Sequence, residues 1–422
     1  MSESLKSLET EIIKCMKCGN CQAVCPLYKE TRSEAAVARG KVRLAAAVLD
    51  GKVDYSANLA HRFDLCLTCM ACVANCPCGV RVDKIVLAAR AALTENRGMP
   101  IPQRVAMTGL SRPALLDKGM KAVGLTQGFL FKHGERGMSP RFPMGLDLKR
   151  VLPPVAKKSL KDQLPEKNSV TKPVMRVAFF AGCVTNYVFP GVGLALAEVL
   201  EKHGVEVVFP KAQHCCGTPV LIHGARDTAK EMAASQVDIF TKAGADAVVT
   251  VCGTCGEAFR HYYPELLAEN PDYARNAGKL AGCTYDIAEL LTDVIPLNKD
   301  LLGPVKTSFT YHEPCHVGRG LEAAGKSEAL LKSIPNADYI SLPEPGRCCG
   351  GAGSFSFEHY NLSSQVLDRK LDDIAGTGAE TVVTGCGSCR IQLNDGLARR
   401  KMPQRVVHTV EILARSMTGK GA

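Results

Sequence analysis

Two cysteine-rich stretches organise this sequence, CMKCGNCQAVCP at residues 15–26 and CLTCMACVANCPC at residues 66–78. Each contains the spacing C-x2-C-x2-C-x3-C followed by proline, which is typical of a loop that wraps around a [4Fe–4S] cluster. Structural zinc sites usually pair two C-x2-C knuckles instead. A disulfide between cysteines three positions apart has poor geometry. The spacing therefore favours iron–sulfur clusters over zinc or disulfides.

Two such stretches in one small segment are typical of a two-cluster ferredoxin, in which the fourth cysteine of each stretch ligates the cluster of the other. This exchange holds the two clusters close together, so that electrons pass over a short path. Cys78 is surplus to both clusters. We expect one ligand set of Cys15, Cys18, Cys21 and Cys76, and another of Cys66, Cys69, Cys72 and Cys25.

The composition limits the class of protein. A chain of 422 residues exceeds one typical domain, and 46% hydrophobic residues suit globular domains with real cores. The N-terminal start is polar, and no apolar run approaches the ~18–20 residues that span a bilayer. Twenty clustered cysteines without an export signal indicate metal ligands in a reducing compartment. We expect a cytoplasmic protein, with any membrane contact peripheral and on the inner face.

Residues 1–98 have the pattern of a mostly helical domain. Residues 34–50 and 82–96 are Ala-rich, with apolar residues at helical spacing, and Gly51 and Gly98 follow them. Two cysteine loops separated by a helix, with further helix outside them, predict a helical ferredoxin domain over residues 1–98.

Residues 99–172 differ from the rest in composition. Pro, Gly, Lys and Met are frequent, and residues 101–170 hold thirteen Lys or Arg against five Asp or Glu. Residues 106–131 have the pattern of two short amphipathic helices. The segment is either a linker that packs along its own protein or a docking segment for an acidic partner or a membrane surface. It lacks nucleic-acid motifs and interleaved aromatics, so we expect no nucleic-acid partner.

From residue 173 onward, short apolar runs alternate with helical patterns. The runs at residues 175–180, 205–209 and 245–251 each lead into a loop and then a helix. Strands that alternate with helices predict parallel βαβ units, whose ligand sites lie beyond the carboxyl ends of the strands. The cysteines of this region lie at those ends.

An internal duplication relates the two halves of this region. The cysteines of the first half recur in the second at offsets of 132, 133 and 134 residues, and AVVTVCGTC matches TVVTGCGSC. This repeat predicts two small α/β domains, at residues 173–300 and 301–422. The first set is Cys183, Cys215, Cys216, Cys252 and Cys255, and the second is Cys315, Cys348, Cys349, Cys386 and Cys389.

Each half thus gathers five thiols from a lone cysteine, a CCG turn and a C-x2-C. Five exceed the four that a cubane cluster or tetrahedral zinc needs, which indicates an atypical cluster or a four-ligand site with a spare thiol. Cys283 lies outside both sets, and we expect it in the core. Histidines close to these motifs in sequence more often hydrogen-bond a neighbouring group than ligate metal; they are His214, His223, His312 and His316.

The paired pattern C-x31/32-CCG-x34/35-C-x2-C resembles the cysteine-rich CCG domain of heterodisulfide reductase subunits. Fused behind a two-cluster ferredoxin, it is similar to the iron–sulfur subunits of glycolate oxidase and of lactate-utilising dehydrogenases. The likeness covers nearly the whole chain except residues 99–172. It implies an α+β multidomain fold, with a helical two-cluster ferredoxin domain followed by duplicated α/β CCG domains.

The resemblance also implies cofactors. We expect two [4Fe–4S] cubane clusters in the ferredoxin domain. The CCG domains would hold one or two further [4Fe–4S] clusters, of cubane or noncubane form, or zinc. No G-x-G-x-x-G follows a strand to seat a dinucleotide, so oxidation of a hydroxy acid needs a flavoprotein partner that carries FAD.

The leading functional hypothesis is therefore an electron-transfer subunit of a lactate or glycolate dehydrogenase complex. It would take electrons from an FAD-containing subunit and deliver them to quinone, ferredoxin or another carrier. The main alternative is a disulfide reductase that binds its substrate at a noncubane cluster in a CCG domain. A third hypothesis is a docking scaffold with structural zinc in the repeats.

Overall fold

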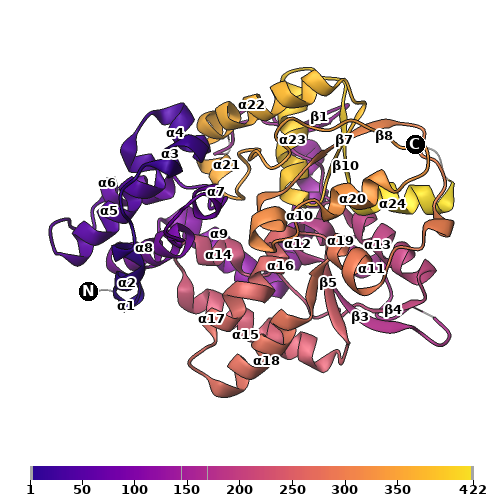
Figure 1. Cartoon of the computed structure of the whole chain (residues 1–422), viewed down its shortest axis with the longest axis horizontal. Coiled ribbons are helices and arrows are strands. Elements are labelled where there is room, and N and C mark those ends of the chain that lie inside the picture. The colour runs from indigo at the N-terminus through magenta and orange to yellow at the C-terminus, as the bar shows by residue number, and fades with distance from the viewer. Residues whose placement is uncertain (1–2, 144, 169, 420–422) are drawn as a thin grey trace.

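The computed structural model describes residues 3–143, 145–168 and 170–419. Its N-terminal part is helical and lies at one end of the molecule (Figure 1). Each of the two cysteine loops leads into a short helix. The longer helix α5 lies between the loops in the sequence, as the Ala-rich pattern of residues 34–50 predicts. The helices are α1 (Glu3–Lys6), α2 (Glu9–Ile13), α3 (Asn20–Val24), α4 (Pro26–Thr31), α5 (Ala38–Leu49), α6 (Ala57–Asp64), α7 (Ala71–Ala74) and α8 (Val82–Arg97).

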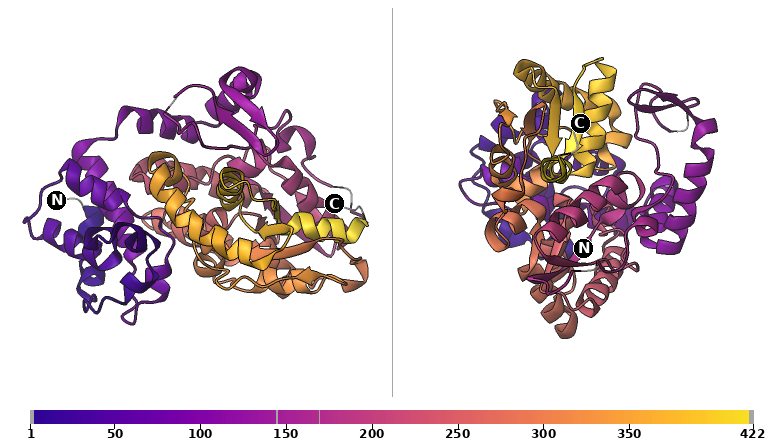
Figure 2. Two further views of the ribbon diagram at one scale, coloured as in Figure 1. Left: turned by 90° about the horizontal axis from the view of Figure 1, so that it is seen from above. Right: turned by 90° about the vertical axis from the view of Figure 1, so that its right-hand side faces the viewer.

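The connecting segment, residues 99–172, runs along the outside of the molecule (Figure 2). Arg150 is buried and its Nη2 donates to Ser356 Oγ (2.9 Å), and the amide of Ala156 donates to the Tyr187 carbonyl (2.8 Å). Its C-terminal half therefore packs on both repeats. The elements are α9 (Ile101–Ser111), α10 (Pro113–Leu130), an antiparallel hairpin of β1 (Phe131–Gly134) and β2 (Gly137–Pro140), and α11 (Leu160–Gln163).

The first repeat is a four-stranded parallel sheet in the order β4-β3-β5-β6. Its strands are β3 (Met175–Phe180), β4 (Val205–Val208), β5 (Ala247–Thr250) and β6 (Thr284–Asp286). Its helices include α12 (Gly182–Tyr187), α13 (Pro190–Lys202), α14 (Thr218–Ile222), α15 (Arg226–Lys242), α16 (Gly253–Glu257), α17 (Tyr263–Leu266), α18 (Pro271–Gly282) and α19 (Ile287–Glu289).

The second repeat has the same topology, with the parallel order β10-β9-β7-β8. Its strands are β7 (Ser308–His312), β8 (Asp338–Tyr339), β9 (Thr381–Thr384) and β10 (Arg405–His408), and its helices include α20 (Lys326–Lys332), α21 (Phe355–Glu358), α22 (Tyr360–Thr377), α23 (Gly387–Arg399) and α24 (Thr409–Thr418). The predicted fold class, a helical part followed by duplicated parallel α/β units, is confirmed.

Both faces of these sheets are buried, as parallel sheets require. Val177 and Phe179 of β3 face one apolar cluster, and Ala178 and Phe180 face the other. The second of these clusters also holds the buried cysteines of both repeats. The carboxyl ends of β3 and β5, and of β7 and β9, therefore bring the cysteine motifs together in the interior.

Two equivalent glycines let the repeats approach each other. A Cβ atom at Gly253 would lie 2.6 Å from the backbone nitrogen of Val317, and one at Gly387 would lie 2.7 Å from Cγ1 of Val184. Each glycine thus packs against the residues after the lone cysteine of the other repeat. This exchange is that of a pseudo-twofold interface, and any larger side chain would push the motifs apart.

Candidate metal centres

The eight predicted ferredoxin cysteines surround two neighbouring cavities in two groups of four. In both groups, the fourth cysteine of one stretch joins the first three of the other. Cys72 borders both cavities, so the two sites are adjacent. We name the groups the inner set, which is Cys25, Cys66, Cys69 and Cys72, and the outer set, which is Cys15, Cys18, Cys21 and Cys76.

The residues present fit two iron–sulfur clusters. The loops wind around the cavities because Lys17, Thr68 and Met70 adopt positive φ angles, and the amide of Val80 lies 3.4 Å from the sulfur of Cys76. Burial raises the pKa of Cys25 to about 11. Thiols in such surroundings stay protonated unless cations replace the protons, and the iron ions of a cluster supply that charge.

Cys78, which the spacing left as surplus, lies beside the cavity of the outer set. Two basic residues near the inner set were missed by the sequence analysis. The buried Lys41 lines that cavity and donates to the carbonyls of Ala35 (3.0 Å) and Arg62 (2.9 Å). Burial lowers the pKa of Lys41 to about 8. Arg90 donates to the Cys66 carbonyl (3.0 Å). No sequence pattern marks these interactions, because the acceptors are backbone carbonyls, which any residue type supplies.

The second-repeat set lies at a cavity where the ferredoxin part and both repeats meet. Thr68 of the ferredoxin loop and Thr218 and Thr254 of the first repeat also line it. The set therefore faces both other cysteine-rich regions. It consists of Cys315, Cys348, Cys349, Cys386 and Cys389, all of which line this cavity.

The first-repeat set is more enclosed. Cys183 lies against Cys215, which lies beside Cys216, and Cys216 in turn contacts Cys255. Leu116 and Lys161 of the connecting segment, with Tyr187, cover the small cavity next to Cys183 and Cys215. The fifth member, Cys252, contacts Cys255. Thus the connecting segment closes this site from outside. Cys283 is half-buried at the edge of the core and lies outside both sets.

Two contacts join these sets into a row. The Cys69 thiol of the inner set lies within hydrogen-bond reach of the Cys348 thiol of the second-repeat set. The Cys386 thiol of that set is in turn close to Cys252 of the first-repeat set. The order is outer set, inner set, second-repeat set and first-repeat set. None of the twenty cysteines, all of which lie in the described residues, forms a disulfide.

Three of the four histidines near the motifs have hydrogen-bond partners. His214 Nδ1 lies 3.0 Å from the Cys215 carbonyl, and His223 Nε2 lies 2.8 Å from Ser354 Oγ. His316 pairs with the buried Glu257 through Nδ1. Burial lowers the pKa of His316, but the carboxylate outweighs this effect and raises it to about 9. His312 alone among these four has no partner on either ring nitrogen.

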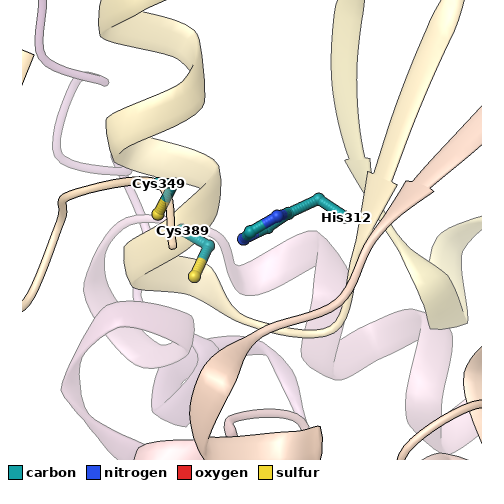
Figure 3. A group of neighbouring side chains, drawn as sticks. All are labelled: His312, Cys349 and Cys389. Atoms are coloured by element: carbon teal, nitrogen blue, oxygen red, sulfur yellow. The ribbon is translucent and has the colours of Figure 1, made fainter. Parts of the chain in front are cut away.

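His312 lies at the second-repeat set. Its imidazole points toward Cys349 and Cys389 (Figure 3), and one donor atom from each of the three residues lies within 4.8 Å of the others. The sequence analysis named His312 only as a neighbour of the motif. An alignment of the two repeats could have singled it out, because the equivalent position of the first repeat is Phe180.

Two known protein families match this chain, one over the ferredoxin part and the other over both repeats. The 4Fe-4S dicluster domain family matches residues 11–80, and the cysteine-rich CCG domain family matches residues 177–260 and 309–394. Multiple iron–sulfur clusters in this chain follow from these matches and from the cavities described above.

Three curated relatives cover large parts of the chain. A probable glycolate oxidase iron–sulfur subunit of Bacillus subtilis (strain 168) is 29% identical over 96% of this chain and 94% of its own. Lactate utilization protein A of Bacillus pumilus (strain SAFR-032) is 34% identical over 57% of this chain and 99% of its own. The glycolate oxidase iron–sulfur subunit of Escherichia coli (strain K12) is 27% identical over 93% of both chains.

The fold is shared with solved structures. A crystal structure of a hypothetical protein from Helicobacter pylori superposes with a TM-score of 0.53 and 11% identity, over 99% of this chain and 76% of the other. That likeness concerns the fold alone. Among the helices of the described residues, none combines the length and hydropathy needed to span a bilayer.

Proposed function

Because the chain belongs to the family of glycolate oxidase iron–sulfur subunits and lactate utilization protein A, we propose that it relays electrons within a flavin-dependent 2-hydroxy acid dehydrogenase complex. The chain is an iron–sulfur electron-transfer subunit. In the proposal, an FAD-containing partner oxidises lactate or glycolate, and this chain passes the electrons to quinone, ferredoxin or another carrier.

The ligands in this proposal are the four cysteine sets. The outer and inner sets each hold a [4Fe–4S] cubane cluster, and the repeat sets hold further [4Fe–4S] clusters or zinc. When bound, such clusters accept and release single electrons. The proposed domains are residues 1–98, the connecting segment 99–172, and the two CCG domains at 173–300 and 301–422.

The observation that carries the proposal is the row of four cysteine sets, in which each set lies next to the following one. Cys18 is exposed at one end, and Cys72 borders the cavities of both ferredoxin sets. Cys69 and Cys348 then bridge the ferredoxin part and the second repeat. A protein that only stores metal has no need to place every set against the next. A relay does, because electrons pass over short paths.

We place the flavoprotein at the exposed end of this row. Ile13 and Met16 beside the outer set are 74% and 66% exposed, and Cys18 lies next to them. Exposed apolar side chains next to a shallow cluster suit a partner that must bring its flavin close. The substitution Ile13→Asp should therefore weaken capture of the flavoprotein, whereas Val174→Asp, at another exposed apolar residue, should not.

The test is anaerobic isolation of the chain with its partners, followed by analysis of iron, zinc and flavin. We expect a flavoprotein to co-purify, and lactate or glycolate to reduce the clusters only when it is present. Iron-free material, or hydroxy acid oxidation by the chain alone, would contradict the proposal.

A disulfide reductase is the second candidate, because the second-repeat cavity leaves room in front of the cysteines. Hydroxyl-bearing residues line it, among them Thr68, Thr218 and Ser388. One experiment distinguishes the two functions. If a disulfide reoxidises the reduced, isolated chain with no flavoprotein present, the result supports the disulfide reductase and not the electron relay.

The proposal includes peripheral contact with an anionic membrane surface through α10. No residue of this 18-residue helix is buried. Leu115, Leu125 and Phe129 are 48%, 88% and 74% exposed and lie on one face at helical spacing, with exposed Lys118 among them. Apolar residues interspersed with lysine suit a helix that lies in the interface of anionic lipids.

Vesicle sedimentation tests this contact. We expect the full chain to bind vesicles of anionic lipid and not those of neutral lipid, and Leu125→Asp to abolish the binding. Val174→Asp is the matched control, since Val174 is 70% exposed outside the helix. If Leu125→Asp instead blocks flavoprotein capture and vesicles never bind, α10 is a protein interface and the membrane contact is refuted.

A further inference from the structure

His312 and Phe180 hold equivalent positions in the two repeats. Each lies three residues before the lone cysteine of its motif and is the last residue of its strand, β7 or β3. The sheet register agrees, since His312 pairs with Thr384 and Phe180 pairs with Thr250. The duplication therefore placed a different side chain at the same point of each metal centre.

The two side chains have different surroundings. Phe180 is fully buried in an aromatic cluster, with its ring centre 4.9 Å from that of Phe259 and 5.6 Å from that of Phe240. His312 is equally buried at 1% exposure, yet neither ring nitrogen has a hydrogen-bond partner in the described part of the chain. A buried polar group without a partner costs ~1–3 kcal/mol, so a metal bound by this imidazole would remove that cost.

The side chains that face the ring are thiols. Donor atoms of His312, Cys349 and Cys389 lie within 4.8 Å of one another (Figure 3). Nitrogen and sulfur bound to one tetrahedral metal at ~2.0–2.3 Å are separated by roughly 3.5 Å, so a small contraction would bring all three onto a metal. Imidazole joins thiolates as a ligand in both zinc and iron–sulfur sites.

We propose that His312 is a nitrogen ligand of the metal centre in the second repeat, alongside Cys349 and Cys389, whereas the first-repeat centre is ligated by sulfur alone. The inference rests on the proposed metal centre and adds a ligand to it. Two sites with matching cysteines thus acquire different donor sets. For iron, a nitrogen donor in place of a thiolate raises the reduction potential, which makes the two centres distinct steps of the relay.

Pulsed electron paramagnetic resonance of the full chain, with 15N-labelled histidine, tests this for iron. We expect strong coupling from a histidine nitrogen in the wild type, its loss in His312→Phe and its retention in His214→Gln. The Phe variant copies the side chain that the first repeat carries at this point. For a zinc centre, the zinc absorption edge should show imidazole scattering that disappears in His312→Phe.

The wild-type signal is decisive even if the variant fails to fold. Metal in the second repeat without strong histidine coupling or imidazole scattering would overturn the inference and leave the proposed function standing. Absence of metal from both repeats would instead refute the proposed centres themselves, so the two failures are distinguishable.

Discussion

Cys252 and Cys386 hold equivalent places in the two repeats, and their thiols contact each other at the interface between them. Each opens the C-x2-C of its motif and precedes a glycine that packs against the other repeat. Because the contact joins equivalent residues, the duplication brought the two repeat cysteine sets face to face. This contact joins the second-repeat set to the first-repeat set, which is the last in the row of four cysteine sets.

Exchange of the fourth cysteine between the ferredoxin loops leads to the first prediction. Cys25→Ser should remove the cluster of the inner set, although Cys25 belongs to the first stretch, and Cys76→Ser should remove that of the outer set. Iron content and the resonance of each cluster check this. Cys283→Ser is the control. Loss of the outer cluster in Cys78→Ser, with retention in Cys76→Ser, would show that Cys78 is the ligand.

Arg319 should control the contact between Cys69 and Cys348. Its guanidinium donates to the carbonyls of Cys69 (3.1 Å) and Gly346 (2.8 Å), one on each side of the junction. Charged hydrogen bonds contribute ~1.5–3 kcal/mol each, so Arg319→Ala should loosen the junction and slow electron transfer into the repeats at least tenfold. Stopped-flow reduction and hydrogen exchange at residues 66–72 measure this.

Arg369 supplies a comparison for Arg319, because its partly exposed ion pair with Glu30 (2.6 Å) also bridges the ferredoxin part and the second repeat. Ion pairs that water can reach contribute only ~0–1 kcal/mol, and the Arg369 side chain is 42% exposed. Arg369→Gln should therefore change the rate much less than Arg319→Ala. Equal effects would mean that net charge, rather than the carbonyl contacts, holds the junction.

Lys41 should raise the reduction potential of the inner cluster. Its buried ammonium lies at the wall of that cavity, where a positive charge favours the more negative, reduced cluster. Lys41→Met should lower the potential by on the order of tens of millivolts. Redox titration of the inner-cluster signal checks this. Lys52→Met, at an exposed lysine, should leave the potential unchanged.

Asp286 should make the first repeat less stable as pH rises. Burial raises its pKa from 3.8 to about 7, so the folded chain keeps a proton that the unfolded chain releases. Stability is then lost progressively between these values, by about 4 kcal/mol in full above pH 7. Asp286→Asn keeps the side-chain oxygen that caps α19 and removes this loss.

Anaerobic melting curves at pH 6 and pH 8 measure the effect of Asp286. The stability gained by Asp286→Asn over the wild type should grow by about 1 kcal/mol between these pH values. Asp338→Asn, at an exposed position on β8, is the control. A gain that stays constant with pH would mean that Asp286 is ionised in the folded chain at pH 6.

Much of the architecture was predictable. The spacing of Cys15–Cys25 and Cys66–Cys78 predicted the two groups of cysteines that border the cavities, and their role as ligands stays a prediction. The repeat offsets predicted two equivalent sheets with cysteines at their carboxyl ends. These features are local, because ligand spacing and strand–helix alternation are properties of short windows of sequence. The family resemblance extended them to a function class.

The order of the four cysteine sets could not be predicted. Residue spacing gave no sign that Cys348 of the second repeat, rather than Cys183 of the first, lies against Cys69, or that His312 faces Cys349 and Cys389 with no other partner. Residue types and spacing determined which cysteines belong to each set, since each set comes from motifs at strand and loop ends. Which centre touches which was settled by tertiary packing, because such contacts depend on how separate sheets and helices bury their faces against one another.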